Sequence, residues 1–241
     1  DQFGNTVSIS GDYAIVGAKD NNSSSGSAYI FKRNGTDWVE HLKLTASDIT
    51  IGDNFGYSVS ISGDYAIIGA KDNNSSSGSA YIFKRDGDDW NEQQKLTASD
   101  ITAGYQFGYS VSINDGYAIV GSPEIDYAME GAAYIFEING DLWTQQQKLT
   151  ASDFAAGSVF GWSVSISGNY AIIGSHGAPM GDELGSAYIF KRNESLWTEQ
   201  KQLTASDYGG GADRFGYSVS INGDYAIVGA KDNNSSSGAA Y

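Results

Sequence analysis

The stretch that decides the fold covers residues 55–83 and reads FGYSVSISGDYAIIGAKDNNSSSGSAYIF. Residues 12–31 and 64–83 differ at a single position, where Val16 stands in the first copy and Ile68 in the second. Five Phe-Gly pairs begin such copies, at intervals of 52, 52, 53 and 55 residues: Phe3, Phe55, Phe107, Phe160 and Phe215. A fixed period of this length indicates stacked or radial repeats. We therefore predict one repetitive domain over residues 1–241, with repeats starting near residues 1, 53, 105, 158 and 213.

The second repeat contains four segments with the signatures of β-strands. In residues 57–62, Tyr, Val and Ile alternate with Ser, which is the period-two pattern of a strand. Residues 65–70 are almost continuously apolar, as expected of a strand buried on both faces. Residues 79–84 supply a third strand, and residues 90–98 a more polar fourth strand. Because radial arrays of four-stranded sheets are β-propellers, we predict an all-β propeller of four-stranded antiparallel blades, with about five repeats and the last one incomplete.

Strand polarity also predicts where each strand lies within a blade. The first two strands are the least polar and carry small residues, so we place them nearest the axis. A Trp recurs once per repeat in the fourth strand and is predicted to fill the wider outer part: Trp38, Trp90, Trp143 and Trp197. The fourth strand occurs one time fewer than the other three, so the last blade should expose an unpaired edge. Another copy of the chain would cover that edge, or the 241 residues belong to a longer repetitive chain.

Composition narrows the classes of partner. The chain has 14 Lys and Arg against 29 Asp and Glu, a net charge of -15, which disfavours nucleic acid because phosphate binding needs clustered cations. No apolar run approaches the roughly 20 residues of a membrane helix, so we expect no membrane insertion. The absence of cysteine excludes disulfides and thiolate metal ligands.

In register with the Phe-Gly pairs, each second strand ends in a Gly-Ala or Gly-Ser motif: Gly17-Ala18, Gly69-Ala70, Gly121-Ser122, Gly174-Ser175 and Gly229-Ala230. This pattern resembles the FG-GAP repeats of integrin α-subunit propellers and many bacterial surface proteins, and the resemblance covers the whole chain. It implies a propeller, usually of seven blades, that serves adhesion or ligand binding at the cell surface or in a secreted protein, here of bacterial origin.

The chain departs from that family at the turn between the first and second strands. Integrin-type repeats often carry an Asp-rich calcium loop there, whereas this chain has short turns such as residues 62–64. A calcium site needs about six to eight oxygen ligands. We therefore predict no calcium at Asp12, Asp64 or Asp224 and no cofactor. The alternative is weak Ca²⁺ binding at the Asp-rich loops between strands.

The phrase Thr-Ala-Ser-Asp recurs before four of the Phe-Gly pairs and ends in equivalent aspartates: Asp48, Asp100, Asp153 and Asp207. Asp53 and Asp213 follow in two of the repeats. Paired carboxylates could hold a cation. A repeated Ser-Asp at a strand exit more commonly closes an Asx turn, which is the interpretation we prefer.

The loop after the second strand is the part that varies most. Residues 71–78 recur at 19–26 and 231–238 and are interpreted as a solvated turn, with a sugar or a weakly held cation as the alternative ligand. Residues 123–131 and 176–185 differ from this pattern. They provide the candidate contacts for a protein or carbohydrate partner: Ile125, Asp126, Tyr127, Met129, His176, Met180, Asp182 and Glu183. The rival explanation is drift in loops that tolerate change.

No distinctive catalytic set is present. His41 and His176 are the only histidines, and they occupy non-equivalent positions. No Ser-His-Asp order, paired histidine motif or phosphate-binding glycine loop occurs. We expect a non-enzymatic binding, adhesion or structural module, extracellular or on the cell surface. The alternatives are the propeller of a secreted hydrolase, with its active residues in the central channel or a flanking domain, and an engineered or excised repeat array with no function of its own.

Overall fold

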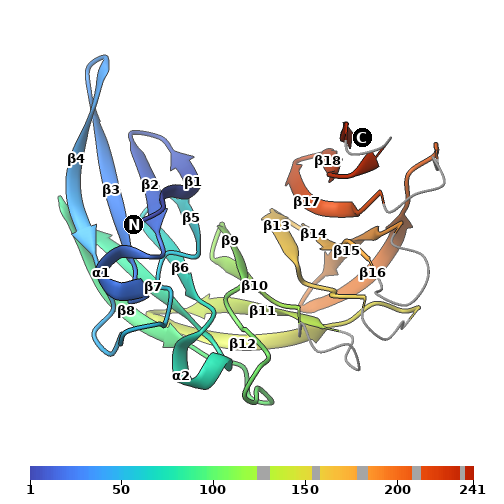
Figure 1. Ribbon diagram of the computed structural model, residues 1–241, viewed down its shortest axis with the longest axis horizontal. Helices are drawn as coiled ribbons and strands as arrows, with labels where there is room; N and C mark the ends of the chain where they lie inside the picture. The colour runs from blue at the N-terminus through green and yellow to red at the C-terminus, as the bar shows by residue number, and fades with distance from the viewer. Residues whose placement is uncertain (124–130, 154–157, 178–183, 208–212, 234–236) are drawn as a thin grey trace.

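The computed structural model describes residues 1–123, 131–153, 158–177, 184–207, 213–233 and 237–241. These residues form five antiparallel sheets, which follow one another as the blades of a propeller (Figure 1). The predicted all-β propeller with an incomplete last blade is therefore confirmed. Among the described residues, no helix combines the length and apolarity needed to cross a lipid bilayer.

Within every blade the strands pair in chain order. Blade 1 contains β1 (Phe3–Ser10), β2 (Tyr13–Ala18), β3 (Ser27–Asn34) and β4 (Asp37–Leu44). Blade 2 contains β5 (Ser58–Ser62), β6 (Tyr65–Ala70), β7 (Ser79–Asp86) and β8 (Asp89–Leu96). Blade 3 contains β9 (Ser110–Asn114), β10 (Tyr117–Ser122), β11 (Ala132–Asn139) and β12 (Leu142–Leu149). Blade 4 contains β13 (Ser163–Ser167), β14 (Tyr170–Ser175), β15 (Ser186–Asn193) and β16 (Leu196–Leu203). Blade 5 contains β17 (Phe215–Asn222), β18 (Tyr225–Ala230) and β19 (Ala239–Ala240).

The loop predicted as a solvated turn is more ordered than expected. It contains the short helical turns α1 (Asn21–Ser24) and α2 (Asn73–Ser76). Asn73 is buried, because its Oδ1 accepts a hydrogen bond from Ser79 Oγ at 2.8 Å and its Nδ2 donates to Asp53 Oδ2 at 2.8 Å. The predicted solvation is therefore wrong for this side chain, which joins the turn to its blade.

The first strands lie on the inner side of the arc and the fourth strands on the outer side (Figure 1), as polarity predicted. Serines on the inner strands of blades 1–4 form hydrogen bonds with the backbone of the next blade. Ser58 Oγ donates to Gly108 O at 2.8 Å. Ser60 Oγ accepts from Ile113 N at 3.2 Å. The inner edges, which would otherwise present unpaired backbone groups, are thus bonded from blade to blade.

The outer strands of blades 2, 3 and 4 are joined by glutamine side chains. Gln94 Nε2 donates to Trp143 O at 2.7 Å, and Trp143 N donates back to Gln94 Oε1 at 2.8 Å. Gln147 repeats both bonds with Trp197, at 2.8 and 2.9 Å. In addition, the pairing of the third and fourth strands is interrupted by a β-bulge in blades 1–4. Bulges and side-chain pairing both make an edge strand a poor template for aggregation.

The hydrophobic core lies between neighbouring blades. Ile15 and Ile30 of blade 1, for example, share one cluster with Val59, Ile61 and Trp90 of blade 2. Three further clusters repeat this arrangement along the chain. Each blade therefore buries its apolar surface against its neighbours, and no single blade holds a core of its own.

The four tryptophans occupy equivalent positions in the pairing of the third and fourth strands, as predicted. Their predicted packing in the outer part of the blade is confirmed in three blades. Trp90, Trp143 and Trp197 are buried, and their rings lie 5.8, 5.6 and 6.1 Å from Tyr13, Tyr65 and Tyr117 of the preceding blade. The prediction is wrong for Trp38, whose exposed fraction is 39%. In the described structure no blade packs on that face of blade 1, so the same residue at the same position stays in solvent.

Glycines mark the points where neighbouring blades touch most closely. Gly78 pairs with Phe107 of the next blade in a parallel bridge, and the same bridge links the other neighbouring blades. A Cβ on Gly69 would lie only 2.0 Å from Gly108 O. The Gly of the Phe-Gly pair and the Gly of the Gly-Ala motif therefore face each other across every blade boundary, which explains why both motifs recur in register.

Candidate functional site

The structure describes one of the predicted contact residues, His176. Seven others lie outside the described residues: Ile125, Asp126, Tyr127, Met129, Met180, Asp182 and Glu183. His176 follows the end of β14, at the edge of the sheet where the first strands begin. The surroundings of His176 therefore show what lies where the divergent segment 176–185 begins.

An aromatic row, which we define as Tyr57, Tyr109, Trp162 and Tyr217, runs along this edge across blades 2–5. Each residue directly follows a Phe-Gly pair and is half-buried. Neighbouring ring centroids are separated by 5.0, 4.6 and 5.7 Å, so the rings form a continuous series on the inner side of the arc. Blade 1 has Asn5 at this position, and its Nδ2 donates to Tyr57 O at 3.1 Å.

His176 belongs to the same series. Its ring centroid lies 4.2 Å from that of Trp162 and 5.5 Å from that of Tyr217. Burial lowers the pKa of His176 to about 4, so the imidazole is neutral at neutral pH. A neutral imidazole has one donor and one acceptor nitrogen, and Nε2 of His176 is buried with no hydrogen-bond partner among the described residues. Residues 176–185 thus begin with an imidazole that packs edge-on against Trp162 of the row.

Lysines add positive charge beside the row. The Nζ atoms of Lys19 and Lys71 each lie 4.9 Å from the centroid of Tyr57, and Lys231 Nζ lies 4.8 Å from that of Tyr217. Cations over aromatic faces are attracted by the ring quadrupole. A tyrosine hydroxyl is protonated at neutral pH, and burial raises the pKa of Tyr57 further. Lys71 Nζ also pairs with Asp72 Oδ2 at 2.7 Å. The edge therefore combines ring surfaces, hydroxyls and charges of both signs.

Sequence reasoning missed the aromatic row. Tyr57 was interpreted as one of the apolar residues that alternate with serine, and this pattern does not show which rings meet across blades. A signal was available, because the residue after Phe-Gly is aromatic in four of the five copies.

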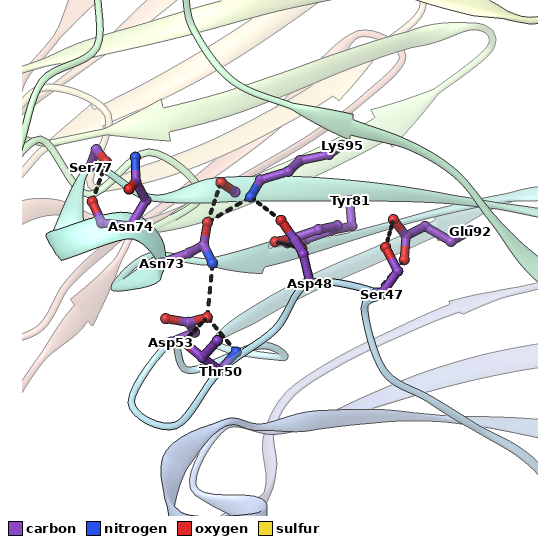
Figure 2. Close-up of polar contacts among 11 residues, drawn as sticks. Ser47, Asp48, Thr50, Asp53, Asn73, Asn74, Ser77, Tyr81, Glu92 and Lys95 are labelled. Carbon is purple, nitrogen blue, oxygen red and sulfur yellow. Dashed lines mark hydrogen bonds and ion pairs between the residues drawn. The ribbon is translucent and has the colours of Figure 1, made fainter.

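The recurrent aspartates make hydrogen bonds within each repeat, and Figure 2 shows those of Asp48 and Asp53. Asp48 accepts hydrogen bonds from Tyr81 Oη at 2.7 Å and from Lys95 Nζ at 2.6 Å. Asp53 accepts from Thr50 N at 2.7 Å and so closes a turn. The predicted turn is therefore made by Asp53, while Asp48 fixes the segment that enters blade 2 to its third and fourth strands.

Equivalent residues make the same attachment in the other blades. Asp100 pairs with Lys148 at 2.7 Å, Asp153 accepts from Tyr188 Oη at 2.9 Å, and Asp207 accepts from Tyr241 Oη. Burial by itself would raise the pKa of Asp48, but the bonds from Lys95 and Tyr81 outweigh it and hold the pKa below its ordinary value. The aspartate of each Thr-Ala-Ser-Asp phrase thus attaches the segment between two blades to the strands of the second blade.

Asp48→Asn should therefore lower the free energy of unfolding by about 1 kcal/mol at neutral pH, the typical net value of one hydrogen bond. The folded pKa of Asp48 lies below its unfolded value of about 3.9. The contribution of Asp48 to the free energy of unfolding is therefore present above the unfolded pKa, and it is lost as the pH falls through the folded pKa. Between neutral pH and about pH 3, the free energy of unfolding measured with urea should accordingly fall less in Asp48→Asn than in the parent chain. Asp37→Asn, at an exposed position, is the control. Equal acid sensitivity of Asp48→Asn and the parent chain would contradict this.

The turns between first and second strands hold ion pairs. Asp12 pairs with Arg33, and Asp64 pairs with Arg85. The absence of calcium at these aspartates remains a prediction. Within the described residues, no group of three or more His, Cys, Asp or Glu side chains is arranged to hold a metal ion.

Antiparallel blades repeated in sequence and in space define this chain as a repeat-built β-propeller. The sequence model of the FG-GAP repeat matches residues 1–31, 38–83, 90–136, 143–190 and 197–241. The chain therefore belongs to the FG-GAP repeat family. A comparison with curated proteins gave no match.

Proposed function

We propose that this chain is a non-enzymatic, extracellular binding module that holds an acidic carbohydrate at the aromatic row. The observation that carries the proposal is the continuity of the row across four blades, with ring centroids 4.6 to 5.7 Å apart. Ligand sites are typically lined by aromatic side chains with a few polar groups that fix orientation. The row has both.

The chemistry of the edge favours a sugar over other ligands. A sugar ring has an apolar C–H face that packs on aromatic surface, and its hydroxyls need donors and acceptors nearby. Tyr and Trp supply both a ring and a polar tip. The ring of His176 packs against Trp162 and Tyr217 and extends the aromatic surface. Lys19 and Lys231, which lie beside Tyr57 and Tyr217, favour a carboxylate or sulfate on the sugar.

Support for an extracellular location comes from family membership, because FG-GAP repeats are typical of extracellular proteins. Support for a non-enzymatic role comes from the sequence, in which nearly every polar residue is repeated. A catalytic centre needs a nucleophile or an acid–base pair in defined geometry. The row offers rings, cations and one neutral imidazole.

A glycan array screened with and without calcium would test the proposal, followed by titration calorimetry with the tightest-bound sugar. Trp162→Ala should weaken binding at least about tenfold, as expected for an aromatic contact worth about 2 kcal/mol. Trp38→Ala is the matched control, since Trp38 lies away from the row. Calcium-independent binding is expected. Binding to no glycan, or equal binding by both variants, would refute the proposal. Release of reducing sugar would favour the hydrolase alternative instead.

A further inference from the structure

The residues that break the repeat meet at the boundary between blades 4 and 5. Trp162 stands where the other members of the aromatic row are tyrosines, and His176 stands where blades 1, 2 and 5 have a lysine. Arg214 precedes the last Phe-Gly pair, whereas the residue before each of the other pairs is uncharged: Gln2, Asn54, Gln106 and Val159. The three residues come from separate segments of the chain, so the fold brings them together.

The imidazole of His176 contacts the rings of two successive blades. Its edge-on contact with Trp162 lies within blade 4, at an interplanar angle of 86°. Its contact with Tyr217 crosses to blade 5, and Tyr217 in turn lies 5.7 Å from Trp162. All three rings therefore touch one another and form a fixed aromatic surface at this boundary.

The charged groups beside this surface are two cations and one carboxylate. Arg214 Nε pairs with Asp232 Oδ2 at 3.1 Å. Lys231 Nζ lies 4.8 Å from the ring centroid of Tyr217, and within the described residues it makes no ion pair. Burial is the main cause of the low pKa of His176. Arg214 and Lys231 lower this pKa further, and Asp232 opposes them, so the sum of the three charges at His176 is positive.

Blade 2 shows how this arrangement differs from the ordinary repeat. There Asp72 pairs with Lys71 at 2.7 Å and accepts a hydrogen bond from Asn54 Nδ2 at 2.7 Å. One lysine and one carboxylate are paired, and the third side chain is neutral. The exchange of Asn54 for Arg214 frees the lysine of blade 5 from the ion pair that its equivalent makes in blade 2.

We propose that Arg214 and Lys231 form an anion site that takes the sulfate or carboxylate of the carbohydrate ligand, with the sugar ring on Trp162. The inference rests on the proposed function and places the charged group of the ligand. Within the described residues Arg214 uses only Nε, for Asp232, which leaves both Nη groups for an oxyanion. A guanidinium binds such a group through two parallel N–H bonds, and a lysine ammonium adds a point charge.

Inorganic sulfate is the first probe, because it tests the anion site without a sugar. A bound anion would offset the two positive charges that disfavour the imidazolium of His176. Sodium sulfate at constant ionic strength should therefore raise the pKa of His176 above its value of about 4, as followed by NMR. His41 is the only other histidine and the internal control, since its Nε2 lies 2.6 Å from Asp88 O, away from the row.

Titration calorimetry then compares a sulfated disaccharide, its desulfated form and a disaccharide that contains a uronate. Arg214→Asn restores the residue of blade 2. It should weaken binding of an acidic sugar at least about tenfold, as expected for hydrogen bonds to a charged group, and leave the neutral sugar unchanged. Arg33→Asn is the matched control, because it removes the same charge where Arg33 pairs with Asp12. The two acidic sugars show whether sulfate or carboxylate is the group that binds.

The anion site is overturned if sulfate shifts His176 and His41 alike or shifts neither. Equal loss of acidic-sugar binding in Arg214→Asn and Arg33→Asn would also overturn it. So would a preference for the acidic sugar that Lys19→Gln removes and Arg214→Asn does not, although that result leaves the proposed function in place. A shift of His176 alone by sulfate, with no glycan bound, would support the anion site and refute the proposed function.

Discussion

Gly69→Ala should destabilise the protein by about 4 kcal/mol or more, well above the 1–3 kcal/mol typical of overpacking. A Cβ at this position would lie 2.0 Å from Gly108 O, a backbone atom of the next blade, and 2.3 Å from Ser58 Oγ. The serine hydroxyl can rotate away, but the carbonyl moves only if blade 3 moves. Its displacement would also disturb Phe107, which is fully buried at this boundary.

Gly229→Ala is the matched control for Gly69→Ala. Gly229 stands at the equivalent position in blade 5, where a Cβ would meet Ser218 Oγ at 2.4 Å and no carbonyl of a following blade. Both variants should be measured by urea unfolding under the same conditions. We expect Gly229→Ala to cost under about 1 kcal/mol. Similar losses in the two variants would show that the boundary tolerates an added methyl group.

Trp90→Ala should cost about 3–5 kcal/mol, the usual range for removing a large buried aromatic side chain. Trp90 packs edge-on against Tyr13 of blade 1, with ring centroids 5.8 Å apart. Its removal would leave a cavity between two rigid sheets that cannot close on it.

Trp38→Ala, at the equivalent position of blade 1, should cost under about 1 kcal/mol because the side chain is already partly in solvent. Chemical denaturation of both variants gives the comparison. A loss below about 1 kcal/mol for Trp90→Ala would mean that its ring contributes little to the blade boundary.

The strands and the repeat could be predicted from the sequence because both are local patterns. Alternation in residues 58–62 and the apolar run in residues 65–70 depend only on adjacent residues. Environments set by a neighbouring blade could not be predicted in this way. Trp38 and Trp90 occupy the same place in their repeats, yet one is exposed and the other is buried.

The residues of the candidate site were harder to predict than the fold, because they are brought together by contacts between segments that lie far apart in the sequence. His176 was identified because its loop differs from the other copies, but its edge-on contact with Trp162 joins residues from different segments of the chain. The role of Asp48 was equally hidden, since Tyr81 and Lys95 lie 33 and 47 residues further along the sequence. A short motif indicates the conformation of its own backbone, whereas the residues that its side chains contact depend on the three-dimensional packing.

The sharing of each hydrophobic cluster between two successive blades has a consequence for how such a chain evolves. A blade that touches only its neighbours can be duplicated by copying one stretch of gene, and the new copy meets faces that already fit it. No compensating substitutions are needed elsewhere in the protein. The single difference between residues 12–31 and 64–83 is what duplication of a self-compatible unit leaves behind. Variation can then accumulate in the loops of individual copies while the blade boundaries stay the same.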